Sequence, residues 1–253
     1  MKIQLLSDLH IEFWPKSLIN VEFDRFQTDA DVLVLAGDIN VGRTNTLDTL
    51  KRFSDRYPRV IYIRGNHEEY GQRYNDFREG IKFADKLPNN VDFLDPGVVH
   101  IDGVTFIGAP LWTDFCGDPL AEQMAAYGIN DFGRVHGLKT HHYVLENEKQ
   151  KLFIKDAYDK YVGRKVIVTH FLPAMECVDP KYTQDPGSIA LNKYFANNMG
   201  NYIDTLSNTT WMFGHTHESV DMTIGDTRLL CNPYGYFGNE LNHNFKANYV
   251  VTV

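Results

Sequence analysis

Five short apolar segments divide the chain, and each of them leads into a polar residue. The segments consist mostly of consecutive apolar residues, without the strict alternation of a half-exposed strand, which is typical of strands buried on both faces of a sheet. We predict such strands over 2–6, 31–36, 59–63, 165–169 and 209–213. If the five strands share a sheet, the polar residues that follow them converge on one edge, where layered α/β proteins bind their ligands.

Amphipathic stretches lie between and after these segments. Apolar residues at helical spacing predict helices over 44–56, 143–161 and 188–206. Near the carboxyl end, the sequence predicts two more strands joined by a hairpin turn at Gly225–Asp226. A final strand is expected over 248–253. This alternation of strands and helices predicts an α/β fold.

The stretch over 112–142 is rich in Gly, aromatic and polar residues and lacks clear periodicity. We interpret it as a cap or insertion over the site, within a single domain over 1–253 whose length suits one large core. No apolar run approaches the roughly 18–20 residues that span a bilayer. The first residues do not resemble a signal peptide, so we expect a cytoplasmic protein with no membrane partner.

Cysteine content and charge narrow the chemistry. The three widely spaced cysteines, Cys116, Cys177 and Cys231, favour neither a disulfide framework nor a thiolate zinc site. The net charge of −8 argues against a broad basic surface for binding nucleic acid, because such binding depends on Lys and Arg. A phosphate substrate stays open, since bound divalent cations reverse the local sign of charge inside an acidic protein.

The polar residues that follow the five strands are potential metal ligands. They are Asp8, His10, Asp38, Asn66, His67, His170, His215 and His217. Carboxylate and imidazole groups suit Mn, Fe, Co, Ni or Zn. A mononuclear site rarely needs so many ligands, whereas two cations that share one carboxylate do. Such cations lie about 3.5–4 Å apart, a spacing that clamps a phosphoryl group.

The short sequences DLH, GD, GNHE, TH and GHTH occur here in the order seen in calcineurin-like metallophosphoesterases. PLWTDF and INDF are similar to stretches of a bacterial and phage branch of that family. The resemblance implies a four-layered α/β/β/α sandwich of two mixed sheets flanked by helices. It also implies a dinuclear site at the carboxyl ends of the strands, holding two divalent transition-metal ions (Mn, Fe, Zn, Co or Ni).

The family pattern also implies a role for each residue. The first metal would bind Asp8, His10 and His217, the second would bind Asn66, His170 and His215, and Asp38 would bridge the two. His67 would not be a ligand. It would contact the phosphate and act as a general acid or charge stabiliser, while a hydroxide bridging the metals attacks phosphorus in line.

One departure from the family concerns the partner of His67. The protein-phosphatase branch reads G-D-x-x-D-R after the second strand, and this chain reads GDINVGR. The aspartate that would orient the catalytic histidine is therefore missing, which counts against a phosphoprotein substrate. We hypothesise that Asp114 or Glu68 orients His67, because a histidine acid needs a partner that fixes its tautomer.

Candidate substrate contacts follow from the same stretches: Asn66, His67, Trp112, Asp114 and Arg64. The aromatic residues near the predicted site loops either pack the cap, which we favour, or stack on a base or sugar. Arg64 either contacts a phosphate or forms an ion pair, which is the commoner fate of an arginine.

We predict a metal-dependent hydrolase of a small phosphomonoester or phosphodiester. A nuclease or cyclic-nucleotide phosphodiesterase is the alternative within the same class, and the acidic composition speaks against the nuclease. A catalytically silent scaffold that uses the metal rim to bind another protein is the alternative of a different class. The complete ligand set and the presence of His67 argue against the scaffold.

Overall fold

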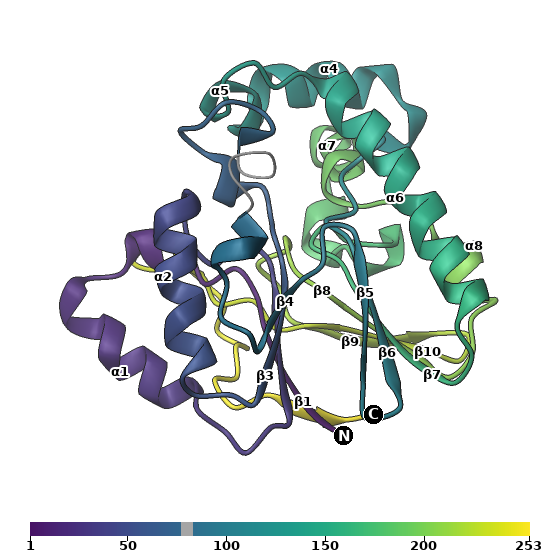
Figure 1. Cartoon of the computed structure of the whole chain (residues 1–253). Helices are drawn as coiled ribbons and strands as arrows, with labels where there is room; N and C mark the ends of the chain where they lie inside the picture. Colours follow the sequence, from purple (N-terminus) through teal and green to yellow (C-terminus); the bar gives the residue numbers. More distant parts are fainter. Residues whose placement is uncertain (77–82) are drawn as a thin grey trace.

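The computed structural model describes residues 1–76 and 83–253 and has four layers, two central sheets with helices on each outer face (Figure 1). This architecture confirms the predicted α/β/β/α sandwich. The first sheet has the order β13-β1-β2-β3-β4. Its strands are β1 (Lys2–Leu6), β2 (Val32–Ala36), β3 (Arg59–Ile63), β4 (Val91–Phe93) and β13 (Val250–Thr252). β1 to β4 are parallel and β13 is antiparallel to β1, so the sheet is mixed.

The second sheet has the order β5-β6-β7-β8-β10-β9. Its strands are β5 (Gly97–Ile101), β6 (Val104–Gly108), β7 (Arg164–Val168), β8 (Thr209–Phe213), β9 (Val220–Ile224) and β10 (Thr227–Cys231). The four inner strands are parallel, and β5 and β9 run antiparallel at the two edges. A short ribbon of β11 (Gly235–Tyr236) and β12 (Glu240–Leu241) lies apart from both sheets.

Helices cover the sheets and the site. They are α1 (Lys16–Phe26), α2 (Arg43–Ser54), α4 (Pro119–Gly128), α5 (Asp131–Arg134), α6 (Thr140–Lys160), α7 (Pro186–Phe195) and α8 (Gly200–Ile203). Four of the shorter 3₁₀ turns matter for the site, at Ile11–Phe13, His67–Glu69, Phe115–Gly117 and Pro180–Thr183. In the described part of the chain, no helix combines the length and apolar character needed to cross a bilayer.

Three apolar layers hold the sandwich together. Phe53 of α2 packs with Leu35 on the outer face of the first sheet. Val34 and Val166 belong to the layer between the two sheets, and Ile154 of α6 belongs to the layer outside the second sheet. Burial of each such aliphatic side chain stabilises the folded state by about 1.5–3 kcal/mol relative to leaving that side chain in water. β2 is buried at every residue, as predicted for a strand covered on both faces.

The five strands predicted between residues 2 and 213 are confirmed to within about one residue, but they do not share one sheet. The first three belong to the first sheet and the last two to the second. The carboxyl ends of both sets point to the same edge of the sandwich. The convergence expected for one sheet is therefore produced by two sheets.

The helix predicted over 188–206 is broken into α7 and α8, because Ala196 is extended. Asn197, just after the break, is fully buried, and its Nδ2 donates to the carbonyl oxygens of Leu111 and Leu172. These tertiary hydrogen bonds outweigh the local helical preference. The region over 112–142 contains a 3₁₀ turn, α4, α5 and the start of α6.

Candidate metal centre

The predicted ligands lie where the carboxyl ends of the two sheets meet. Asp8 and His10 follow β1, Asp38 follows β2, and Asn66 follows β3 in the first sheet. The second sheet supplies the remaining three histidines, which follow β7 and β8: His170, His215 and His217. All seven side chains are buried or nearly so.

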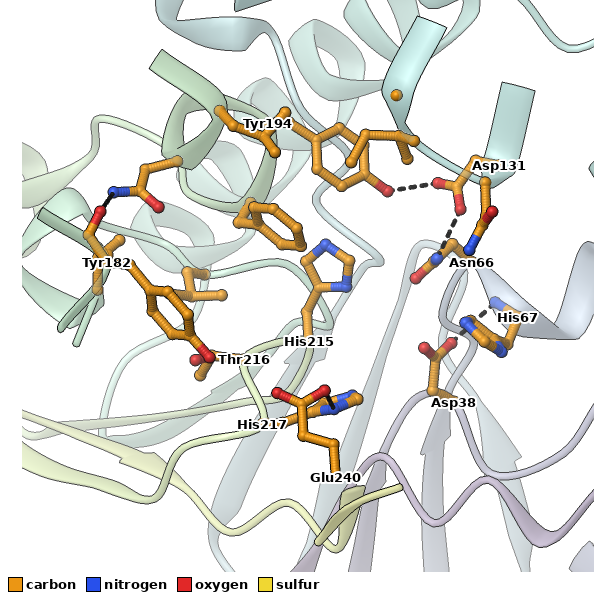
Figure 2. A pocket seen from close by; sticks show the side chains of 18 of the residues that line it. Asp38, Asn66, His67, Asp131, Tyr182, Tyr194, His215, Thr216, His217 and Glu240 are labelled. Atoms are coloured by element: carbon orange, nitrogen blue, oxygen red, sulfur yellow. Dashed lines mark hydrogen bonds and ion pairs between the residues drawn. The ribbon is translucent and has the colours of Figure 1, made fainter. Parts of the chain in front are cut away.

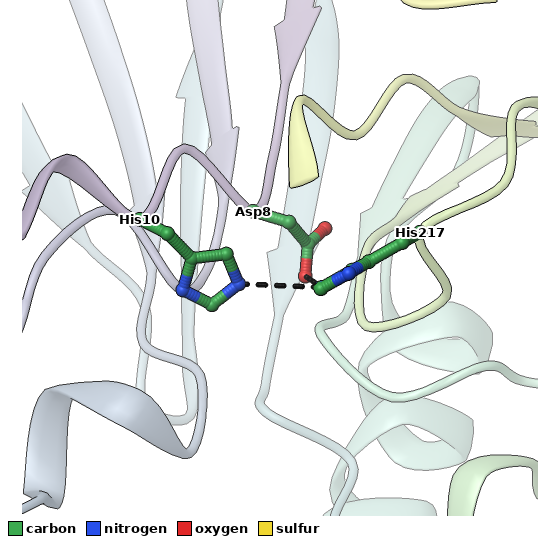
Figure 3. Close-up of side chains that lie close together, drawn as sticks. All are labelled: Asp8, His10 and His217. Carbon is green, nitrogen blue, oxygen red and sulfur yellow. Dashed lines mark hydrogen bonds and ion pairs between the residues drawn. The ribbon is translucent and has the colours of Figure 1, made fainter. Parts of the chain in front are cut away.

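One group of potential ligands contains Asp8, His10 and His217 (Figure 3). The Nε2 atoms of the two histidines lie 3.3 Å apart. The Nε2 atom of His217 lies 3.8 Å from Oδ1 of Asp8. One carboxylate and two imidazoles thus face a common point, which suits a divalent transition metal.

A second group contains Asp38, His170 and His215. Asn66 joins it, because its Oδ1 lies 3.1 Å from Nε2 of His170. The Nε2 atom of His215 is buried without a hydrogen-bond partner among the described residues. A buried polar atom without a partner is costly, so a cation at this point would satisfy it.

Asp38 lies between the two groups. Its Oδ2 is 3.8 Å from Nε2 of His10, and its Oδ1 is 3.5 Å from Nε2 of His170. Oδ1 also accepts a hydrogen bond of 2.9 Å from the backbone N–H of His67. One carboxylate therefore presents an oxygen to each group, as a bridging ligand must.

The imidazoles are fixed by their second nitrogens. Nδ1 of His170 is 2.8 Å from the carbonyl oxygen of Ala36, so Nδ1 donates and Nε2 is left as the ligand atom. Nδ1 of His10 lies 3.3 Å from Oε1 of Glu12. Nδ1 of His217 lies 3.5 Å from Oε2 of Glu240. All three histidines thus turn Nε2 towards the centre.

The backbone at the site is strained. Four predicted ligands have positive φ angles, namely Asp8 (50°), His10 (45°), Asp38 (53°) and His215 (68°). Such conformations cost of order 1–3 kcal/mol each and persist where the surroundings enforce them. The strain turns these side chains out of the strand direction and towards the shared edge.

Glycine is required beside the ligands because the backbone of the neighbouring loops passes very close to the ligand side chains. A Cβ atom at Gly65 would overlap Oδ1 of Asp38 and lie 2.7 Å from Cε1 of His170. At Gly214 a Cβ atom would lie 2.8 Å from Oδ2 of Asp8. The glycines of the GNHE and GHTH sequences therefore make room for ligands on neighbouring loops.

The charges of the centre are coupled. Burial alone would raise the pKa of Asp38, but the nearby imidazole of His170 holds that pKa well below its usual range. Burial opposes the charged form of His170, yet Asp38 raises its pKa to about 9. Asp38 and His170 therefore stabilise each other's charged forms, and a cation bound between them would displace the proton of His170.

His67 lies beside the ligands, with a partner on each ring nitrogen. Its Nδ1 is 3.3 Å from Oε1 of Glu12, and its Nε2 is 3.0 Å from the hydroxyl of Tyr236. The ring also packs against Tyr70 at a centroid distance of 4.2 Å. Burial lowers the pKa of His67, but Asp38 and Glu12 outweigh this effect and raise the pKa to about 9.

The hypothesis that Asp114 or Glu68 orients His67 is wrong, because Glu12 occupies that position. The Glu68 carboxylate instead accepts hydrogen bonds from the backbone N–H groups of Ile39 (2.9 Å) and Gly65 (2.8 Å). Asp114 caps a 3₁₀ turn and pairs with Lys151 at 2.6 Å.

Two further predicted substrate contacts, Arg64 and Trp112, are buried among other side chains and are not among the clustered ligands. Arg64 is fully buried, pairs with Glu69, and lies 2.6 Å from the carboxylate of Asp95. Trp112 is buried as well, with its ring stacked on Tyr143 at 4.6 Å and 4°. Arg64 therefore forms ion pairs, and Trp112 packs against the ring of Tyr143.

Asp131 is the buried residue that holds Asn66 in place. Its Oδ1 accepts hydrogen bonds from Nδ2 of Asn66 (2.8 Å) and from the hydroxyl of Tyr70 (2.6 Å). Its Oδ2 accepts from the hydroxyls of Tyr143 (2.9 Å) and Tyr194. Figure 2 shows Asp131 between Asn66 and Tyr194. Because the amide nitrogen of Asn66 is bound to Asp131, its oxygen is directed towards the second group of ligands.

Sequence reasoning assigned no role to several residues of the site. Asp131 belongs to the INDF stretch, which was the available signal for it. Glu12 follows His10 by two residues and could have been found from that spacing. Glu240 comes from the short ribbon of β11 and β12, for which the sequence contains no recognisable motif.

Taken with the four-layered fold, these clustered ligands define a metal-dependent phosphoesterase. A family model described as calcineurin-like phosphoesterase matches residues 1–219, and the chain belongs to that family.

The chain is also similar to a viral protein and shares its fold with solved structures. An uncharacterized protein of Acanthamoeba polyphaga mimivirus is 24% identical over 276 residues, covering 96% of this chain and 94% of its own. The fold resembles that of phosphopantetheinyl hydrolase from Mycobacterium tuberculosis, with a TM-score of 0.70, 16% identity and coverage of 93% and 89% of the two chains. It also resembles a dimetal phosphatase from Danio rerio, with a TM-score of 0.51, 13% identity and coverage of 95% and 89%.

Proposed function

We propose that this protein hydrolyses a small phosphomonoester or phosphodiester at a dinuclear centre of divalent transition metals. The observation that carries the proposal is the position of Asp38, whose two oxygens face two separate groups of ligands. Asp8, His10 and His217 would hold one cation, and four residues would hold the other: Asp38, Asn66, His170 and His215. When bound, the cations supply a hydroxide nucleophile at neutral pH and neutralise charge on the phosphoryl oxygens.

His67 is proposed as the general acid. Its Nδ1 is held by Glu12, so the proton available for transfer is on Nε2, at the position now facing the Tyr236 hydroxyl. A leaving-group oxygen at that position would accept the proton as its bond to phosphorus breaks. General acids of this kind contribute about 10²–10⁴-fold to the rate.

The test uses metal-stripped protein restored with Mn²⁺ or Zn²⁺ and assayed on para-nitrophenyl phosphate and bis-para-nitrophenyl phosphate. We expect turnover that depends on metal and falls by about 10²–10⁴-fold in a His67→Ala variant, while bound metal per chain stays at the wild-type value. The preferred ester separates a monoesterase from a diesterase. Hydrolysis that rises steeply with oligonucleotide length would favour a nuclease instead.

One result would overturn the proposal. If metal binds firmly and neither these esters nor a panel of nucleotides and cyclic nucleotides is hydrolysed, the metal rim serves as a binding scaffold. Metal content measured on the same samples separates that result from a failure to load the centre.

A further inference from the structure

A pocket of about 410 Å³ opens directly from the metal centre (Figure 2). Its inner end is formed by Asp38, Asn66, His67 and His215. From there it extends between the loop that precedes α5 and the segment that carries the Pro180–Thr183 turn and α7. Its size is within the range of sites that hold a small organic molecule.

The outer wall of the pocket is largely apolar and aromatic. It is formed by Ile129, Leu172, Val178, Tyr182, Leu191 and Phe195. Leu191 and Phe195 are only partly buried, although both pack against the aromatic cluster of the cap. Apolar surface that remains open beside a catalytic centre favours a ligand with apolar surface of its own.

Charge is distributed unevenly along this pocket. No Lys or Arg is found among its described lining residues. The acids outside the ligand set are Asp131, which is buried and bound by four donors, and Glu240, whose side chain is 51% exposed. Of the nearby lysines, Lys193 pairs with Asp118, and Lys181 pairs with Glu218 while its ammonium group lies over the Tyr182 ring. Beyond the metal centre, the pocket is therefore neutral to acidic.

This distribution restricts the substrate. A phosphoryl group placed at the metals would leave the rest of the molecule in the apolar part of the pocket. A second phosphate or a carboxylate there would lose water and find no cation, which is strongly unfavourable. We propose that the pocket binds the uncharged, partly apolar organic group of a phosphoester that carries a single phosphoryl group. This inference rests on the proposed hydrolysis and names the substrate class for it.

A second hollow lies on the other side of His67 and has a different lining. It shares His67, Tyr70, Asn130 and Tyr236 with the first pocket. Its further lining includes the cationic side chain of Arg134, together with His136 and the acid Glu12. An anionic substituent would find a cation there and not in the first pocket. Binding in the first pocket would therefore disfavour a negatively charged substituent on the substrate, whereas binding in the second hollow would favour one.

The experiment compares two substrates of similar length and leaving-group acidity that differ in a terminal carboxylate, para-propylphenyl phosphate and para-carboxyethylphenyl phosphate. They are used as monoesters or as methyl diesters, whichever class the enzyme hydrolyses. We expect kcat/KM to be at least about tenfold higher for the propyl compound. In a Leu191→Lys variant the preference should shrink by about tenfold or reverse, because the new ammonium group pairs with the carboxylate. Leu191→Met is the matched control and should keep the preference.

The outcomes separate this inference from the proposed function. Equal kcat/KM for the two compounds, or a preference for the carboxylate, would overturn the inference while metal-dependent hydrolysis stands. A preference for the carboxylate that is lost in Arg134→Gln would assign the leaving group to the second hollow. If neither compound nor the nitrophenyl esters are hydrolysed, the proposed function fails. Unchanged unfolding midpoints of both Leu191 variants would show that the shift is not caused by misfolding.

Discussion

Replacing Asp131 with Asn tests whether this buried carboxylate positions a metal ligand. The carboxylate accepts four hydrogen bonds, from Asn66, Tyr70, Tyr143 and Tyr194. An Asn side chain keeps one carbonyl oxygen and turns an NH₂ group towards the other donors. Hydrogen bonds to a charged group are worth about 1.5–3 kcal/mol each, so we expect Asp131→Asn to lower the free energy of unfolding by about 3 kcal/mol.

The more informative effect is on metal binding. With its nitrogen no longer held by Asp131, the amide of Asn66 can turn over and present nitrogen in place of oxygen. Loss of such an outer-shell partner typically weakens metal affinity by about 10–100-fold. We expect this loss at one of two sites in a calorimetric titration of metal-stripped protein with Mn²⁺, with a parallel fall in kcat/KM.

Tyr143→Phe is the matched control. It removes one donor to the other oxygen of Asp131 and leaves the bond to Asn66 intact. It should cost about 1 kcal/mol of stability and leave metal affinity unchanged. If Asp131→Asn bound both metals as tightly as the wild type, Asp131 would be a structural residue only, and the assignment of a positioning role would be refuted.

Three further predictions follow from the site. Carboxylates at Asp38 and Glu12 raise the pKa of His67 to about 9 against its burial, so a rate that needs protonated His67 is lost as the pH rises through that value. Glu12→Gln should move this loss to lower pH in a kcat/KM profile, whereas Asp114→Asn should not; equal profiles for all three proteins would exclude Glu12. Gly65→Ala places a methyl group on the Asp38 carboxylate, and we expect loss of metal binding or a fall in stability of several kcal/mol, about the cost of an overpacked core site. Removing metal should lower the unfolding temperature, because a metal present at a hundred times its Kd stabilises the folded state by about 2.7 kcal/mol; an unchanged temperature would mean that no metal binds.

Much of the fold could be predicted from the sequence because its strands are short, apolar and buried. β2 and β8 were predicted this way, and their ends carry the residues that form the site. What periodicity could not show is the partition into two sheets. Val60 of β3 and Ile167 of β7 both belong to short apolar strands, yet Val60 packs on the outer face of the first sheet and Ile167 on the outer face of the second. The break after Phe195 was equally hidden, because it depends on hydrogen bonds to segments distant in the chain.

The predicted ligands lie together because each one directly follows a strand. The acid that orients His67 was predicted wrongly. The candidates were chosen only because Glu68 is adjacent to His67 in the sequence and Asp114 lies in the predicted cap. Glu68 is adjacent to His67, yet its carboxylate turns back to bind the backbone of the neighbouring loops. Glu12 reaches His67 across the space between two loops. Contacts of this kind depend on backbone direction, including the positive φ of His10, which no pattern of residue types records.

The ligands come from both sheets and from distant parts of the chain, which determines when during folding the metal centre can form. The first sheet contributes four of the seven residues, and the last two, His215 and His217, lie far along the chain beyond β8. A growing polypeptide that has not reached them holds neither group complete. Docking of the two sheets is also required, since Asp38 and His170 approach each other only across that junction. Both groups of ligands therefore require that the chain has been made through His217 and that the two sheets have docked.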